Sequence, residues 1–226
     1  MSPRRVPVSR RDRPAKAPLS RAGAVAVGLR IMREEGLERL TMRRLAAELD
    51  TGPSSLYVYV QNMAELHGAI LDELLAGLEL PATSADSWRD DVIALMSGYT
   101  RLLMAYPSLA RSVLTLRPSG PHYVRFIDAL LGLLHAGGVP VGQAAWGVDL
   151  LLQHGTAIAA EQGTRGESVD AGDEHQLLVM ELREAAEAEF PNIARVREEL
   201  FSGTGEERFA WTFGVLIAGI SAVPVG

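Results

Sequence analysis

Cysteine is absent from the 226 residues of this chain, and so are the short motifs of familiar catalytic chemistries. Without cysteine there are no disulfides and no thiolate metal ligands. The sequence also contains no phosphate-binding glycine loop, no nucleophile elbow and no HExxH zinc motif. These absences argue against an enzyme, and we expect neither a metal nor another cofactor.

An apolar run that would cross a membrane is also missing. Residues 209–226 carry no charge, but glycines and a proline interrupt them and no basic cluster follows. Residues 129–148 are uncharged as well, and the segment 135–140 divides them into two helices. The basic first residues lack the apolar stretch of a signal peptide. We therefore expect a cytoplasmic protein with no membrane partner.

The charges are distributed unevenly along the chain. The net charge is −6, but residues 1–62 hold 12 Lys+Arg and 6 Asp+Glu, whereas residues 63–226 hold 10 and 22. A basic end on an acidic body is typical of a DNA-binding head carried by a second domain. Residues 1–18 combine prolines and arginines without apolar periodicity and are predicted to form a disordered arm. This arm has two interpretations, a DNA contact or a solubilising tail.

Helical periodicity runs through the rest of the chain, and nothing alternates with period two for long enough to form a strand. The sequence predicts an all-α protein with an N-terminal three-helix head and a larger helical domain for ligand binding and dimerisation. The predicted boundaries are 19–66 for the head and 67–226 for the body. The three head helices are expected after Ser20, Thr41 and Gly52, and a helix that links head and body is expected after Asn62, running to about residue 78. Body helices are expected near 86–105, 107–115, 121–136, 140–163, 174–189, 191–201 and 205–221, with a polar, mobile loop from Gly163 to Gly172.

Two short helices separated by a tight turn at 50–52 predict a helix-turn-helix unit. In such a unit the second helix enters the major groove by its N-terminal residues, which are small and polar here. Arginines at the start of the first helix suit phosphates or guanine edges, and tyrosines after the second suit phosphates. The tyrosines have an alternative role in packing the head. The candidate DNA-binding residues are Thr41, Arg43, Arg44, Pro53, Ser54, Ser55, Tyr57, Tyr59 and Asn62.

A resemblance to the TetR family rests on several segments of this head. They are Leu19-Ser20-Arg21, Glu35-Gly36-Leu37, residues 40–46, residues 55–60, Asn62 and Glu65-Leu66. Beyond them Asp86-Ser87-Trp88, Arg117-Pro118 and the final helix are similar to the tetracycline-repressor branch, although the C-terminal domain is divergent.

The resemblance implies a ligand-released repressor that binds palindromic operator DNA as a homodimer. It implies base contacts by Arg43 and residues 53–55, and phosphate contacts by Thr41, Ser55, Tyr57 and Tyr59. The chain departs from the family pattern at Asp50, where the turn usually has glycine, and at Met63, where the family often has lysine.

A sensor also needs a pocket, which should be mostly apolar with a few polar groups. We predict a small apolar or amphipathic effector, although each aromatic residue has ordinary core packing as an alternative. His67 and His154 lie on apolar helices and have the same two interpretations. The candidate ligand-binding residues are Trp88, Tyr99, Leu103, Arg117, Tyr123, Phe126, Trp146, Gln153 and His154.

The final helix is apolar all round, which indicates a second copy of the chain as its partner. Two other functions remain open from the residues: a ligand-independent DNA-binding protein with a solid body, and a helical enzyme. A pocket of several hundred cubic ångströms would separate the sensor from the first of these.

Overall fold

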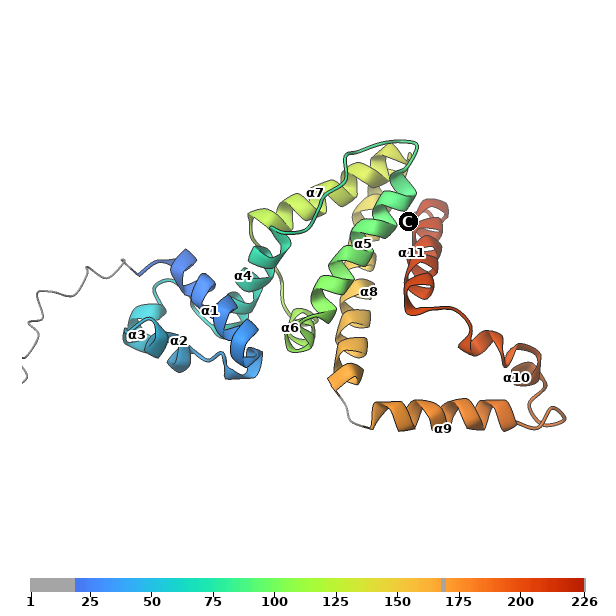
Figure 1. The fold of residues 1–226 in the computed structure, drawn as a ribbon. Coiled ribbons are helices and arrows are strands. Elements are labelled where there is room, and N and C mark those ends of the chain that lie inside the picture. Colours follow the sequence, from blue (N-terminus) through green and yellow to red (C-terminus); the bar gives the residue numbers. More distant parts are fainter. Residues whose placement is uncertain (1–18, 168–169, 226) are drawn as a thin grey trace, which may run out of the picture.

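The computed structural model describes residues 19–167 and 170–225, and in these ranges the chain is helical without strands (Figure 1). The predicted all-α class is confirmed. The predicted basic arm, 1–18, lies outside the described residues. Figure 1 shows a small head, α1 to α3, joined through α4 to a larger group of helices.

The head consists of α1 (Arg21–Glu35), the 3₁₀ helix η2 (Leu37–Arg39), α2 (Met42–Glu48) and α3 (Pro53–Leu56). At two of the helix starts, a side chain accepts a hydrogen bond from a backbone N–H group that has no partner within the helix. Ser20 Oγ accepts from the Gly23 N–H at 3.0 Å, and Thr41 Oγ1 accepts from the Arg44 N–H at 3.1 Å. A cap of this kind contributes about 1 kcal/mol to the stability of its helix.

Helix α4 (Met63–Leu75) connects head and body. Asn62 Oδ1 caps it by accepting from the Glu65 N–H at 2.8 Å. The helix packs on α1 in the head and on α6 and α7 in the body. It is therefore continuous across the predicted domain boundary at residue 66, and it ends at Leu75 rather than near residue 78.

The body is built around α5 (Trp88–Met104) and α8 (Val141–Glu167), which pack on each other. Helices α6 (Pro107–Val113), α7 (Pro121–Ala136) and α11 (Gly205–Ala222) complete it. The Tyr99 and Phe126 rings stack at 5.2 Å between centroids in its core. None of the helices in the described residues is long and apolar enough to span a lipid bilayer.

The predicted loop from Gly163 is wrong, because α8 continues to Glu167. Two contacts explain the extra turn. Arg111 on α6 donates to Thr164 Oγ1 at 2.7 Å and to Glu167 at 3.1 Å. At Gly163 a Cβ atom would lie 2.9 Å from Pro107 Cγ, so glycine lets α8 pack closely on α6. Tertiary contacts thus override the weak helix propensity of this polar segment.

The segment 170–204 extends away from the body between α8 and α11 (Figure 1). It contains α9 (Ala171–Glu184), α10 (Pro191–Val196) and the 3₁₀ helix η3 (Glu199–Phe201). The helix predicted to reach residue 189 ends at Glu184, and the one predicted for 191–201 is divided in two. No residue of these three elements is buried.

Candidate DNA-binding surface and ligand cavity

The start of α3 is exposed and carries little side-chain bulk. Gly52 is its N-cap and Pro53 occupies its first turn, while Ser54 and Ser55 are exposed beside them. Leu56 is fully buried and anchors the helix to the head. A free, small and polar helix N-terminus fits against the edges of bases in a major groove.

The turn before α3 uses an unusual residue. Asp50 has φ of 49°, in the left-handed region that favours glycine. Aspartate tolerates this region better than most side chains, because its short polar group can bond locally. Asp50 therefore adopts the conformation of the turn at the position where the family usually has glycine.

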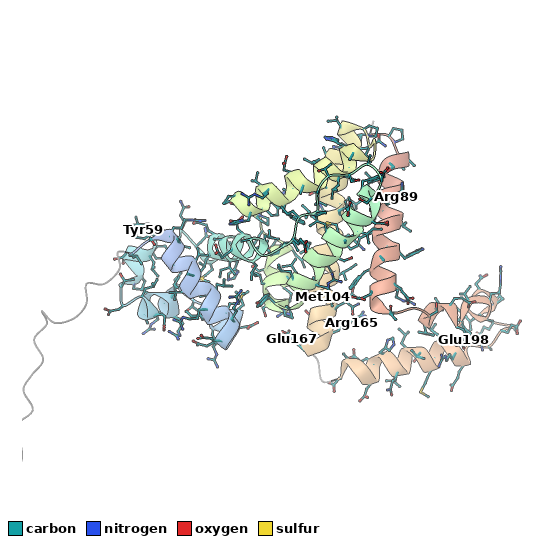
Figure 2. The ribbon with its side chains drawn as sticks, turned by 45° about the horizontal axis from the view of Figure 1, so that its top comes forward. Tyr59, Arg89, Met104, Arg165, Glu167 and Glu198 are labelled. Atoms are coloured by element: carbon teal, nitrogen blue, oxygen red, sulfur yellow. The ribbon has the colours of Figure 1, made fainter. Side chains whose placement is uncertain are left out.

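The predicted DNA-binding residues divide by exposure. Seven of them are exposed: Thr41, Arg43, Pro53, Ser54, Ser55, Tyr57 and Asn62. Tyr57 has 53% of its surface exposed, whereas Tyr59 is partly buried against the core of the head (Figure 2). Thr41 and Asn62 also cap helices through their side-chain oxygens.

The two neighbouring arginines of α2 have different surroundings. Arg44 forms ion pairs with Glu35 at 2.6 Å and with Glu48 at 2.5 Å, and Arg30 also pairs with Glu48. This network ties α1 to α2 and occupies the Arg44 guanidinium. Arg43 is exposed and makes no hydrogen bond or ion pair within residues 19–167 and 170–225. Of the two, Arg43 is the one whose donors are available.

A cavity of about 540 Å³ lies in the body. It is bounded by α5, by the segment 113–118 that begins at the last residue of α6, by the start of α7 and by one face of α8. Tyr99, Arg117, Tyr123 and Gln153 of the predicted ligand-binding set line it.

The other five predicted residues do not line this cavity, and a role for them in ligand binding stays a prediction. Leu103 and Phe126 are buried in the core. Trp88 packs against Gly137, where a Cβ atom would lie 2.2 Å from its ring. His154 meets Phe213 of α11 edge-on at 5.8 Å between ring centroids. Trp146 is 69% exposed and lines a different hollow. Residue type alone did not reveal which way each side chain faces.

The cavity has a polar side of which the sequence analysis identified only Gln153. Asp149, Gln153 and Thr156 follow one another at i, i+4 and i+7, and therefore share one face of α8. This spacing on a largely apolar helix was a readable signal. The remaining lining residues that were missed are Val113, Leu114, Thr115, Leu116, Pro118, Leu152 and Ala157.

The tyrosines of the cavity are held in the neutral form. The Tyr99 hydroxyl lies 2.7 Å from Thr156 Oγ1 and is deeply buried, and this burial raises the pKa of Tyr99 well above its usual range. Burial also raises the pKa of Tyr123, with a further contribution from the charge of Asp149, while Arg117 opposes them. Two neutral phenols thus offer hydrogen-bond donors and acceptors inside a partly apolar space.

A second hollow of about 560 Å³ lies between α8 and α11. Gln143 Nε2 ties the two helices by donating to the Ile220 and Ser221 carbonyls at 2.9 and 3.2 Å. Ile220 fills the space that a Cβ atom at Gly147 would need. The lining is almost wholly apolar and includes Trp146, Leu150, Val215, Leu216, Val223 and Pro224.

Comparison with known proteins decides the family. The profile "Bacterial regulatory proteins, tetR family" matches residues 24–70, and "Tetracyclin repressor-like, C-terminal domain" matches residues 80–223. The chain belongs to the TetR family of transcriptional regulators.

Several TetR relatives are similar over most of the chain. A transcription regulator of Streptomyces coelicolor shares 49% identity at a TM-score of 0.77, covering 93% of this chain and 98% of that one. ActR of the same organism shares 34% identity at a TM-score of 0.81, covering 92% and 97%, and is also known in complex with actinorhodin. The repressor DrrR1 of Streptomyces coeruleorubidus is 34% identical over 131 residues, which span 56% of this chain but only 48% of its own length. These relatives are regulators rather than enzymes.

Two hydrogen bonds tie the cavity wall of this TetR chain to α4. The His67 Nδ1 atom lies 2.8 Å from Ser112 Oγ, just before the wall segment 113–118. Asp72 Oδ1 accepts from the Tyr123 N–H at 2.7 Å, just after it. Gly120, with φ of 142°, leaves room for the Asp72 carboxylate, which would lie 2.3 Å from a Cβ atom there. The wall is therefore held at both ends by the helix that carries the head.

The partly buried His67 side chain predicts a pH-dependent stability. Burial lowers the pKa of His67, and no hydrogen-bond partner for its buried Nε2 is found within the described residues. Between this lowered pKa and 6.5 the unfolded chain binds more protons, so the free energy of unfolding falls as pH falls through that window and is constant above it. Urea unfolding at several pH values should show a weaker fall for His67→Asn. His135→Asn, at an exposed position, should keep the full dependence; an unchanged slope in the His67 variant would contradict the prediction.

Proposed function

We propose that this TetR protein is a repressor that binds palindromic operator DNA as a homodimer in the cytoplasm and is released by a small amphipathic effector. The observation that carries the proposal is the cavity of about 540 Å³ whose wall is tied to α4 by His67 and Asp72. A molecule that fills the cavity displaces the wall, and the wall moves the helix on which the head is mounted.

Repression by release follows from the geometry of two heads on one DNA. Operator half-sites lie about one helical turn, roughly 34–36 Å, apart. A tilt of α4 changes the separation of the two α3 helices, and binding to both half-sites then weakens. DrrR1 is named a repressor, and ActR is known with actinorhodin bound, which supports both parts of the proposal.

In the head, we assign contacts with bases to Arg43 and to the exposed start of α3, and contacts with phosphates to Thr41 and Tyr57. Arg44 is given a supporting role, because Glu35 and Glu48 already pair with it. Tyr59 is partly buried and Asn62 caps α4, so we assign each of them a structural role beside a contact with DNA.

The alternative of a ligand-independent DNA-binding protein requires a solid body. A cavity of several hundred cubic ångströms with polar groups on one side favours the sensor. The α8–α11 hollow supports the dimer, because exposed tryptophan and aliphatic side chains gather there on the two helices.

Binding to the DNA that flanks the protein's own gene tests the proposal. We expect specific, salt-sensitive binding, because lysine and arginine contacts to phosphates release counterions. Arg43→Ala should weaken it about tenfold or more, in line with about 1–3 kcal/mol for a base contact, and Tyr57→Ala should weaken it as well. Arg125→Ala, an exposed arginine of α7, should bind as the wild type does. Equal binding by all the variants would contradict the assigned surface, and failure of the wild type to bind any fragment specifically would contradict the proposed operator there.

A further inference from the structure

The cavity has two chemically different sides. Its α8 side presents Asp149, Gln153 and Thr156 in one row, with the Tyr99 hydroxyl bonded to the last of them. The opposite side is mainly aliphatic and comes from the segment 113–118. A molecule with an apolar part and an oxygen-rich edge satisfies both sides, whereas a purely apolar one leaves the row of polar groups unpaired.

Arg117 is a charged residue in the cavity lining, and no other side chain of the described residues pairs with it. It makes no hydrogen bond or ion pair within the part of the chain that the structure describes. Most other arginines of the body are engaged: Arg101, Arg165 and Arg183 pair with glutamates, and Arg197 and Arg208 donate to backbone carbonyls. A guanidinium left open in a domain with a large excess of acidic residues is suited to an anion that arrives from outside.

The charge of Arg117 acts inside the cavity, because it lowers the pKa of the Tyr123 hydroxyl while the charge of Asp149 raises it. The two charged groups come from different walls, the 113–118 segment and α8. Asp149 accepts from Gln153 Nε2 and keeps further acceptor capacity, so a hydroxyl donor of the ligand can pair with it. A ligand therefore needs an anionic group on one side and hydroxyl groups on the other.

We infer that the effector is a hydroxylated carboxylic acid with an apolar part, with its carboxylate bound by Arg117 and its hydroxyl groups along Asp149, Gln153 and Thr156. This inference rests on the proposed function and adds the chemical class of the effector. The guanidinium offers two parallel N–H donors to a carboxylate, which is the strongest form of such a pair. Tyr123 lies beside it and supplies a further neutral donor.

Two dyes with the same ring system test the class. One is 4,5-dihydroxyanthraquinone-2-carboxylic acid, and the other has a methyl group in place of the carboxyl. Both are titrated into the full-length protein without DNA, and binding is followed by tryptophan fluorescence and calorimetry. We expect the acid to bind roughly tenfold more tightly than the methyl compound, as befits a charge-assisted pair.

Arg117→Gln should remove this preference and leave the affinity for the methyl compound unchanged. Arg125→Gln is the matched control, because Arg125, like Arg117, is exposed and makes no hydrogen bond or ion pair within the described residues, but it lies outside the cavity lining. It should retain the preference. Equal affinity of the two dyes for the wild type, absence of binding by both, or a preference that survives Arg117→Gln overturns the inference.

The outcome is independent of the operator experiment. A preference for the acid that depends on Arg117, in a protein that binds no operator, supports the ligand class and contradicts the proposed regulation. Specific operator binding by a protein that does not distinguish the dyes contradicts the ligand class and supports the proposed operator binding.

Discussion

Replacing Trp146 by glutamate is expected to convert the protein from a dimer to a monomer and to weaken operator binding by roughly a hundredfold or more, because the second head no longer adds to the affinity. Trp146 is 69% exposed in the single chain and lies in the apolar hollow between α8 and α11. Large exposed side chains of this kind mark an interface. A carboxylate in the middle of such an interface has no partner there and is costly to bury.

The oligomeric state and operator affinity should be measured on the same preparations, by light scattering after gel filtration and by fluorescence anisotropy. Val124→Glu is the matched control, since Val124 is an exposed apolar residue of α7 outside this hollow. It should remain dimeric and bind the operator normally. A Trp146→Glu protein that stays dimeric would contradict the assigned interface, and a monomer that still binds the operator at full affinity would contradict the need for two heads.

The proposed interface illustrates what could be predicted from the sequence and what could not. An apolar surface all round α11 required a covering partner, and this argument needed no coordinates. The same reasoning did not extend to Trp146, which was assigned to the ligand. Its helix has one face toward the cavity and another toward α11, and both faces carry large side chains. Only the packing of α8 on its neighbours separates the two faces.

Only some of the residues that line the cavity could be predicted from the sequence. Tyr99, Arg117, Tyr123 and Gln153 were found because aromatic and polar residues are typical of ligand sites. Phe126 has the same aromatic signal, but it fills the core, as the aliphatic Leu103 does. The polar row on α8 was a better guide, because a polar residue on the inner face of a helix must meet a partner or a ligand.

Helix starts were predicted better than helix ends. Ser20, Thr41 and Asn62 cap their helices through short side-chain oxygens, and such caps are local features of the sequence. The end of α8 depends instead on Arg111 and Pro107, which lie more than fifty residues away. Distant contacts of this kind leave no local mark, which is why the extra turn was missed.

Asp72→Ala is expected to lower the free energy of unfolding by about 2–3 kcal/mol, since hydrogen bonds to charged groups are the strong ones and the start of α7 then has an unsatisfied N–H. Asp72 is buried and its Oδ1 accepts from the Tyr123 N–H at 2.7 Å. The N-terminal end of a helix also favours a negative charge. The loss should appear in urea unfolding followed by circular dichroism.

Asp72→Asn separates the two contributions, because asparagine keeps an acceptor oxygen but not the charge. It should recover more than half of the loss, whereas Glu73→Ala, at the exposed neighbouring position, should change the free energy of unfolding very little. If the alanine and asparagine variants were equally destabilised, the hydrogen bond to Tyr123 would not be the stabilising contact. A stable Asp72→Ala protein would mean that α4 does not hold the start of α7, and the cavity wall would then lack one of its two connections to the head.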